Sequence, residues 1–352
     1  MQRKKFHVSS FKGGHRSAGR AKAEPSATAT VLSLGMAVAW LIAAVALPVP
    51  SGLLAVNTTR FRILQVSDTH CLGDATDAAT HSFIREAVKG EQPDLVVFSG
   101  DQLDANAVQL RRAMLATLRA AGRPFLALSG NHDNRGEVEA SSRLAGALGV
   151  QVEGGRFLDL TDRQGKRLFR LWAFDWLEER DWEGRARQRC ARPATRLLAQ
   201  HKLTCRSLRD RERFHDLSVR DPVKALAFVH MPTPEFAEEG RPTRPVGNAL
   251  EPVSSTWADD GWTEALGAQG VLGIFAGHDH TNDYCVESHA LPALCYAGYA
   301  GVGAYGAPVE RRLRVIELQG LGKPRPAIWT WKRVEPSEEG QEGRTIDVQR
   351  LV

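Results

Sequence analysis

Short apolar runs, each ending at a polar motif, limit most strongly what this chain can fold into. The runs are near-continuous and lie at Phe61–Val66, Leu95–Phe98, Phe125–Leu128, Leu168–Phe174, Leu226–Val229 and Val271–Phe275. Such runs are typical of strands that are buried on both faces. Candidate helices lie between the early runs, at 81–89, Val108–Ala121 and 138–148. Alternating strands and helices predict an α/β architecture with mainly parallel pairing in this half of the chain.

The pattern changes in the last quarter of the chain. Three further strands are expected there, with no long helix between them, at Leu291–Tyr296, Arg312–Leu318 and Ala327–Arg333. Sheets that pack on each other and are flanked by helices would accommodate both halves.

Five polar motifs follow the apolar runs in a fixed order. They are Asp68-Thr69-His70, Gly100–Asp104, Gly130–Asp133, His230 and Gly277–His280. Loops at the carboxyl ends of strands meet at one edge of an open α/β sheet, so we expect these motifs to converge. Together they supply carboxylate, imidazole and amide groups, the ligand mixture of a two-metal hydrolytic site.

Taken alone, the motifs differ in how strongly each one indicates a metal site. Asp-x-His at a strand end is more often a cap or a hydrogen-bonded core group than a ligand pair. Gly100 allows the tight turn that would aim Asp101 into a site. Asn131 offers a neutral oxygen ligand beside a titratable His132. In Gly-His-x-His, the i, i+2 spacing puts both rings on one side of an extended segment.

The ordered set resembles the calcineurin-like metallophosphoesterase superfamily, over a stretch from about Phe61 to Arg333. The resemblance implies a four-layer αββα sandwich. It assigns the first metal ion to Asp68, His70, Asp101 and His280. It assigns the second metal ion to Asp101, Asn131, His230 and His278, with Asp101 bridging. It also implies that His132 donates a proton to the leaving group and that Asp133 holds His132.

A narrower resemblance points to the small branch of plant purple-acid-phosphatase-like proteins and to related fungal phosphatases. It rests on Val229–Phe236, Gly277–Cys285, Leu294–Tyr296 and Trp329–Arg333. True purple acid phosphatases use Asp-x-Gly and Gly-Asp-x-x-Tyr, whose tyrosine binds ferric iron. Here Asp104 stands at that tyrosine position and His70 joins the ligands, so we expect a colourless enzyme. The cofactor would be two divalent or mixed-valence metal ions, with Fe, Zn and Mn all open.

The function implied by this resemblance is hydrolysis of phosphomonoesters by a metal-bridging hydroxide, with His132 as proton donor. Asp104 is expected to orient ligands. Two alternatives stay open. One is a phosphodiesterase or pyrophosphatase of the same superfamily. The other is a non-catalytic scaffold that keeps the fold, although such proteins normally lose ligands and every ligand position is filled here.

Charge is concentrated at the start of the chain. Residues 1–22 carry seven Lys or Arg and no acidic residue, so the formal charge of +5 leaves the remainder at −2, from 39 basic and 41 acidic residues. A nucleic-acid partner is therefore not indicated. Residues 180–220 are also rich in Lys and Arg. A solvated surface insertion is the preferred interpretation there, with an anion-attracting flap as the alternative.

An apolar segment follows the basic tail. Val31–Leu47 is apolar apart from Ser33, and its seventeen residues would span roughly 25 Å as a helix, near the ~30 Å hydrocarbon core of a bilayer. We expect a basic cytoplasmic-type tail at 1–26, a signal anchor or signal peptide at 27–50, a metallophosphoesterase domain at 58–335 with the insertion at 180–220, and a polar tail at 336–352. The catalytic part would then be luminal or extracellular, or secreted if the segment is cleaved at Ala44-Val45-Ala46. An organellar transit sequence is the less favoured alternative.

Two further features bear on the compartment. Asn57-Thr58-Thr59 is a glycosylation sequon, which agrees with a secretory route. Of the five cysteines, Cys285 and Cys295 could form a disulfide in an oxidising compartment, or both stay reduced in the cytosol.

The glycine-rich loop Gly298–Gly306 is expected near the metals, with Tyr299 and Tyr305 as parts of a turn. The oligomeric state stays open.

Overall fold

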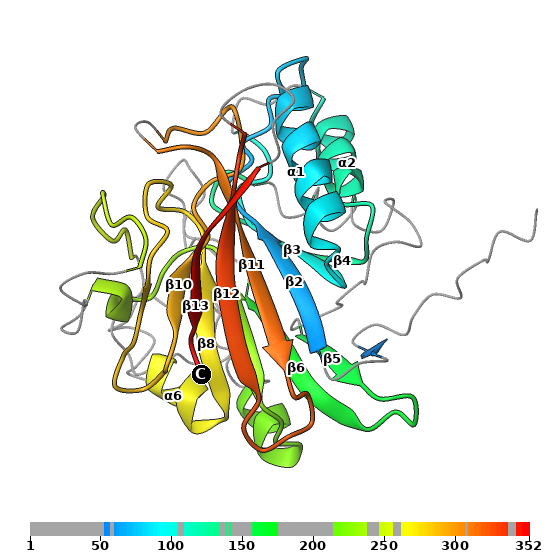
Figure 1. Cartoon of the computed structure of the whole chain (residues 1–352), viewed down its shortest axis with the longest axis vertical. Helices are drawn as coiled ribbons and strands as arrows, with labels where there is room; N and C mark the ends of the chain where they lie inside the picture. Colours follow the sequence, from blue (N-terminus) through cyan, green and yellow to red (C-terminus); the bar gives the residue numbers. More distant parts are fainter. Residues whose placement is uncertain are drawn as a thin grey trace, which may run out of the picture. The chain divides into compact units, whose positions relative to one another are not determined.

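Two β-sheets of mixed strand direction form the frame of the protein (Figure 1). The computed structural model describes residues 53–56, 60–104, 109–133, 138, 141, 157–174, 214–237, 246–255, 262–306, 309–336 and 343–352. All of them belong to one compact unit, Ala46–Val352.

The six-stranded sheet has the order β13-β12-β11-β2-β3-β4. Its parallel half consists of β2 (Arg60–Val66), β3 (Leu95–Ser99) and β4 (Phe125–Leu128). Its antiparallel half consists of β11 (Arg312–Gln319), β12 (Ala327–Val334) and β13 (Arg344–Arg350). β11 joins the two halves by pairing antiparallel with β2.

The seven-stranded sheet has the order β1-β5-β6-β7-β8-β10-β9. Its strands are β1 (Leu53–Ala55), β5 (Phe157–Thr161), β6 (Arg167–Phe174), β7 (Ala225–Val229), β8 (Val271–Ala276), β10 (Leu294–Tyr296) and β9 (Cys285–Val286). From β6 to β10 the neighbours in the sheet run parallel. β9 pairs antiparallel with β10, where Cys285 lies opposite Cys295 and forms a disulfide with it.

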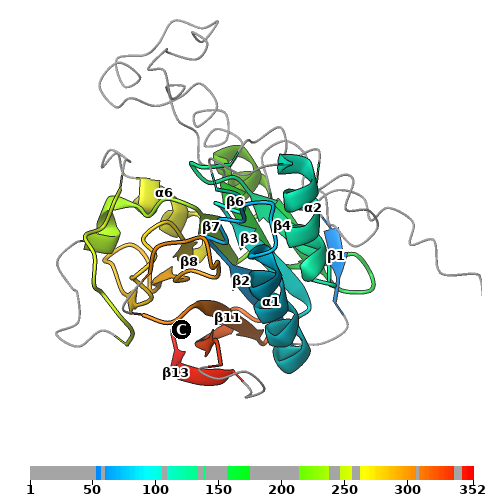
Figure 2. The same ribbon diagram turned by 90° about the horizontal axis from the view of Figure 1, so that it is seen from above.

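Apolar side chains on both faces of each sheet explain the near-continuous apolar runs. Leu95 and Val97 of β3 belong to the cluster between the sheets, whereas Val96 and Phe98 belong to a cluster on the outer face, as the period of two in a strand requires. That outer cluster includes side chains of α1 (Asp77–Glu91) and α2 (Leu110–Ala120). A third cluster contains α6 (Trp262–Ala268) and side chains of β7 and β8. Figure 2 shows α1 and α2 beside β2–β4, with α6 on the far side of β7 and β8.

The sequence located most of these elements. Every strand that it predicted is present, with ends that agree within three residues, and so are helices close to 81–89 and Val108–Ala121. The first helix begins earlier, at Asp77, whose carboxylate accepts hydrogen bonds from the backbone N–H groups of Leu72 and Gly73. For 138–148 only residues 138 and 141 are described, and both are helical.

The C-terminal residues are not a simple polar tail. Part of 336–352 forms β13, which pairs with β12 at the edge of the six-stranded sheet. No side chain of β13 is fully buried, so no apolar run marked this strand in the sequence. β1, β5 and β9 were also missed, and two of them have at most three residues.

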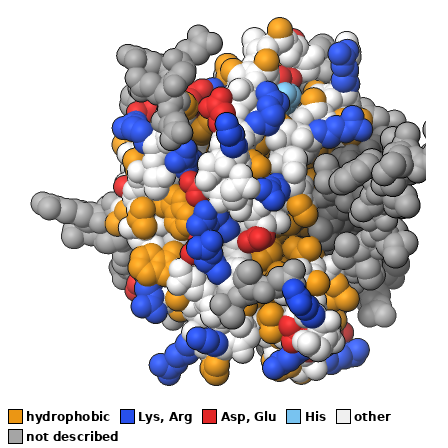
Figure 3. Space-filling view, turned by 45° about the vertical axis from the view of Figure 1, so that its right-hand side comes forward, with side chains coloured by type: hydrophobic (Ala, Val, Ile, Leu, Met, Phe, Trp, Pro, Cys, Tyr) orange, Lys and Arg blue, Asp and Glu red, His pale blue; other side chains and the backbone are white. Residues whose placement is uncertain are grey.

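Among the described residues, none of the helices combines the length and the apolar character that a membrane crossing needs. The expected tail at 1–26, the apolar segment at 27–50, Asn57 and most of 180–220 lie outside the described residues. On the face drawn in Figure 3, Lys and Arg side chains are spread between apolar ones, with acidic groups among them.

Candidate metal centre

The five polar motifs meet at the carboxyl ends of five strands. Asp68 and His70 follow β2, Asp101 follows β3, Asn131 and His132 follow β4, His230 follows β7, and His278 and His280 follow β8. Three overlapping groups of side chains have their ligand atoms within 4.8 Å of one another: Asp68 with His70 and His280, His70 with Asp101 and His132, and Asp101 with His230 and His278. The convergence expected from the strand order is therefore present.

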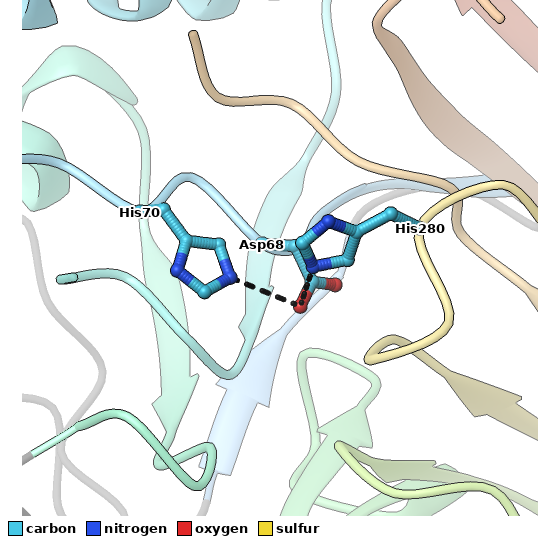
Figure 4. A group of neighbouring side chains, drawn as sticks. All are labelled: Asp68, His70 and His280. Carbon is cyan, nitrogen blue, oxygen red and sulfur yellow. Dashed lines mark ion pairs between the residues drawn. The ribbon is translucent and has the colours of Figure 1, made fainter. Parts of the chain in front are cut away.

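The first group surrounds one oxygen of Asp68 (Figure 4). Asp68 Oδ1 lies 3.3 Å from His280 Nε2 and 3.9 Å from His70 Nε2. Both Asp68 Oδ1 and His70 Nε2 are buried and take part in no hydrogen bond. Since burying such atoms without a partner is costly, their shared direction indicates a position for a cation.

The second group is built around Asp101. Asp101 Oδ2 lies 3.2 Å from His230 Nε2 and 3.6 Å from His70 Nε2, so this carboxylate faces both groups. Asn131 Oδ1 lies 2.9 Å from the same His230 nitrogen. The ring of His278 lies with its centroid 5.2 Å from that of His230. Asp101 thus occupies the central position that a bridging ligand needs.

Backbone carbonyl groups fix the tautomers of two imidazoles. The Nδ1 atom of His230 lies 3.0 Å from the Ser99 carbonyl oxygen, and that of His280 lies 2.7 Å from the Tyr305 carbonyl oxygen. Because a carbonyl oxygen can only accept, each Nδ1 carries a hydrogen, which leaves Nε2 as the nitrogen available to the cluster. Both Nε2 atoms face the carboxylates, which is the usual orientation of histidines that bind metals.

The backbone of this region adopts conformations that direct the side chains inward. Gly100 has φ of +103°, and a Cβ atom at this position would collide with the ring of His230. A glycine is therefore required where the chain turns from β3 into Asp101.

Burial and mutual charge determine the protonation of the cluster. Burial alone would raise the pKa of the Asp68 carboxyl, but the rings of His280, His230 and His70 outweigh burial and hold it well below its usual range. The pKa of Asp101 is lowered in the same way, chiefly by His230. Burial lowers the pKa values of His70 and His278, whereas the neighbouring carboxylates outweigh burial and raise the pKa of His280 and, to about 9, that of His230. Ionised carboxylates and neutral imidazoles are the forms that bind metal ions.

Asp133 supports the loops around the site. Its carboxylate accepts hydrogen bonds from the backbone N–H groups of Gln102, Leu103 and Gly130, at 3.0–3.2 Å. Burial, reinforced by the charge of Asp101, raises the pKa of Asp133 to about 7. The role that the resemblance implied, in which Asp133 holds His132, stays a prediction. The hydrogen bonds of the Asp133 carboxylate join the loop after β3 to the loop after β4.

His132 and Asp104 lie at the margin of the cluster. His132 is exposed, and its ring centroid lies 4.9 Å from that of His70. Its backbone N–H donates to Asp101 Oδ1 at 2.8 Å. Asp104 Oδ2 lies 3.8 Å from His70 Nδ1, which is an ion-pair distance but longer than a hydrogen bond.

Sequence reasoning missed the groups that orient the histidines. The carbonyl of Ser99 leaves no signal in a sequence, because every residue has one. The loop Gly298–Gly306 does approach the cluster, as predicted: the N–H groups of Ala300 and Gly301 donate to the carbonyl groups of Ser67 and Asp68. Within this loop, Tyr305 does more than form a turn, since its ring stacks on His280.

The residues present fit a pair of metal ions. Carboxylate, imidazole and amide donors suit Zn, Fe and Mn, and Asp101 and His70 are each shared by two of the three groups. Asp68 Oδ1 and His70 Nε2, which have no hydrogen-bond partner, lie where a cation would satisfy them.

Several known proteins are similar to this chain. The family model described as "Calcineurin-like phosphoesterase" matches residues 61–282. The chain is 29% identical to "Probable inactive purple acid phosphatase 14" of Arabidopsis thaliana over 355 residues, covering 83% of this chain and 84% of that protein. It is 25% identical to "Phosphatase DCR2" of Saccharomyces cerevisiae over 359 residues, covering 82% of this chain and 57% of that protein. Among solved structures, a dimetal phosphatase from Danio rerio aligns with 83% of this chain and 98% of its own, at 13% identity and a TM-score of 0.46.

Proposed function

Because the chain belongs to the calcineurin-like phosphoesterase family, we propose that it hydrolyses phosphomonoesters at a two-metal centre. The observation that carries the proposal is the place of Asp101, whose carboxylate lies within 3.6 Å of imidazoles from both groups. A single carboxylate between two sets of histidines is the arrangement that holds two cations close together.

The proposed ligands divide into two sets that share Asp101. The first set is Asp68, His70, Asp101 and His280. The second set is Asp101, Asn131, His230 and His278. Two bound cations would polarise the phosphoryl oxygens and acidify a water molecule. The carboxylates and imidazoles hold the site in place, while Ser99 and Tyr305 keep Nε2 of His230 and His280 turned inward. The choice between Fe, Zn and Mn stays open.

His132 is the proposed proton donor to the leaving group. Its ring is exposed beside His70, so it can reach a group that enters from solvent. An imidazole at the mouth of the site can protonate the ester oxygen as the bond to phosphorus breaks. The backbone bond from His132 to Asp101 keeps its position relative to the ligands constant.

The test joins metal analysis to hydrolysis. We expect purified protein to contain two equivalents of metal and to hydrolyse p-nitrophenyl phosphate in preference to bis(p-nitrophenyl) phosphate. Asp101→Asn should lose metal and activity together. Asp216→Asn, which alters a side chain that is 65% exposed, is the matched control and should lose neither. Hydrolysis of the diester alone would replace the phosphomonoesterase proposal with the phosphodiesterase alternative.

A non-catalytic scaffold is the second candidate, because some relatives are named "Probable inactive". The complete ligand set of this chain argues against that alternative. A protein that binds two metals but hydrolyses no monoester, diester or pyrophosphate would support the scaffold.

The bounds of the domain and its location in the cell are also part of the proposal. We propose a four-layer αββα domain over 58–335, preceded by a basic tail at 1–26 and a signal anchor or signal peptide at 27–50. The domain would face the lumen or the exterior of a secretory compartment, with a phosphorylated substrate as its partner and no nucleic acid. The basic composition of 1–22 and the sequon at Asn57 support this location.

A further inference from the structure

An exposed tyrosine ring stands at the rim of the metal centre. The ring of Tyr305 lies nearly parallel to that of His280, with an interplanar angle of 19° and 3.9 Å between centroids. The residue is nevertheless 57% exposed. Tyr299 is also nearly parallel to His280, at 5.8 Å, but it is buried. Tyr305 therefore presents aromatic surface to solvent directly beside a proposed ligand.

Hydrogen bonds hold this exposed ring in place. The Tyr305 hydroxyl donates to Glu251 Oε2 at 2.9 Å, and Glu251 Oε1 accepts from both the backbone N–H and the hydroxyl of Thr281. The Tyr305 carbonyl accepts from His280. A ring fixed at its backbone and at its hydroxyl loses little conformational freedom when a second ring binds to it.

Other apolar side chains are exposed on the loops that carry Tyr305 and Glu251. Leu250, next to Glu251, is 56% exposed, and Val302, three residues before Tyr305, is 45% exposed. The backbone N–H of Leu250 donates to Asn282, two residues after His280, and that of Val302 donates to Thr80. The two loops that carry Tyr305 and Glu251 thus also expose apolar side chains, and Glu251 adds a carboxylate that contacts the Tyr305 hydroxyl.

A series of ring contacts links the proposed proton donor, His132, to this rim. The rings of His132, His70, His280 and Tyr305 follow one another at centroid separations of 4.9, 5.0 and 3.9 Å. A phosphoryl group held between His70 and His280 would place its leaving group within reach of both His132 and Tyr305.

We propose that Tyr305 is a specificity-determining residue, which selects phosphomonoesters whose leaving group is a neutral or cationic aromatic alcohol. This inference rests on the proposed function. The aromatic ring stacks on the Tyr305 face, and the Glu251 carboxylate disfavours a second anionic group on that ring. In the reaction the bond between phosphorus and the ester oxygen breaks, water supplies the new phosphate oxygen, and the phenol leaves with a proton from His132.

The test compares an aromatic and an aliphatic substrate in the same variants. We expect Tyr305→Leu to lower kcat/KM for phenyl phosphate about three- to tenfold more than for ethyl phosphate, in proportion to a lost aromatic contact. Tyr305→Phe keeps the ring and should keep most of the preference. Val219→Ala, at another exposed apolar position, is the control and should leave the ratio unchanged. Equal losses for both substrates in Tyr305→Leu would mean that Tyr305 only positions His280, and would overturn the inference.

Binding without turnover provides an independent readout. Benzylphosphonate and propylphosphonate replace the ester oxygen by a methylene group and cannot be hydrolysed. We expect the purified protein to bind benzylphosphonate more tightly, and Tyr305→Leu to abolish the difference. Glu251→Gln should improve the hydrolysis of 4-carboxyphenyl phosphate relative to phenyl phosphate by several fold. Absence of all phosphoester hydrolysis would count against the proposed function, whereas an active enzyme without an aromatic preference would count against this inference alone.

Discussion

Four of the residues proposed as metal ligands have a backbone conformation that side chains other than glycine seldom adopt. Asp68, His70, Asp101 and His278 have φ values of 53°, 40°, 50° and 72°. Each such residue costs about 1–3 kcal/mol of folding free energy, although Asp and His tolerate this region better than most residues. This backbone conformation directs each side chain toward the cluster at the end of its strand. Metal binding would offset part of this cost, because it favours the folded state alone.

Metal removal should therefore lower stability. A ligand at one hundred times its dissociation constant stabilises a folded protein by about 2.7 kcal/mol per site. We expect a chelator to lower the Tm of the purified protein by several degrees, as measured by differential scanning fluorimetry. Asp101→Asn should melt at the same temperature with and without chelator, while Asp216→Asn should respond as the wild type does. A wild-type Tm that is indifferent to chelator would contradict the assignment of these residues as ligands.

The role of His132 can be separated from that of the ligands by the choice of leaving group. We expect His132→Gln to lower kcat for an alkyl phosphate by about 10²–10⁴-fold, the usual contribution of a general acid. The loss should be much smaller for p-nitrophenyl phosphate, because p-nitrophenolate can leave without a proton. Metal content, measured by plasma emission spectroscopy, should stay unchanged. A variant that loses metal would show that His132 is a ligand, which its place in one of the three groups also permits.

At the scale of elements, one side-chain cluster ties the antiparallel half of the six-stranded sheet to its parallel half and to α1. Glu317 of β11 accepts two hydrogen bonds from Arg62 of β2, at 3.0 and 2.7 Å. Arg62 also donates to the Glu91 carbonyl at the end of α1. Burial alone would raise the pKa of Glu317, but the hydrogen bond from Gln319 and the guanidinium of Arg62 outweigh it and hold the pKa below its ordinary 4.5.

This lowered pKa fixes the sign of a pH dependence. The ionised form is favoured in the folded state, so its contribution is fully present above pH 4.5 and is lost as the pH falls through the lower folded-state pKa. We expect Glu317→Gln to lower the unfolding free energy by about 1–2 kcal/mol at pH 7. In urea titrations, this difference between the wild type and the variant should become smaller as the pH falls toward 4. Glu310→Gln, which alters an ion pair that is 56% exposed on each side, should change little. A difference that grows on acidification would refute the role given to this pair.

Elements that carry an apolar run could be predicted, and elements that lack one could not. Strands such as β3 and β7 are buried at every position, and their sequences are apolar apart from Ser99 at the end of β3. β13 lies at a sheet edge and β9 has two residues, so neither carries an apolar run, although each pairs with a strand that is adjacent in the chain. Tertiary context determines such segments more than their own residues do.

At the scale of the whole molecule, the site follows from topology. Asp68 and His280 are more than two hundred positions apart, and their side chains lie 3.3 Å apart because β2 and β8, one from each sheet, both end at the cluster. The sequence predicted this convergence, since the end of each strand carried a recognisable motif. It did not predict the roles of Asp133 and Tyr305. Asp133 acts through backbone amides and Tyr305 through its carbonyl and ring, and neither contact has a pattern in the sequence.

The sequence also predicts where this unit resides, through its first sixty residues. If Val31–Leu47 inserts with the basic tail on the cytoplasmic side, the catalytic unit is luminal and Asn57 becomes accessible to glycosylation. We expect the protein expressed in eukaryotic cells to shift in mobility after endoglycosidase treatment, and Asn57→Gln to abolish the shift. Carbonate extraction and identification of the N-terminal peptide would then separate an anchor, which stays in the membrane with its tail, from a cleaved signal. A soluble cytosolic protein without glycan, or one imported into an organelle, would refute the secretory assignment while leaving the metal centre untouched.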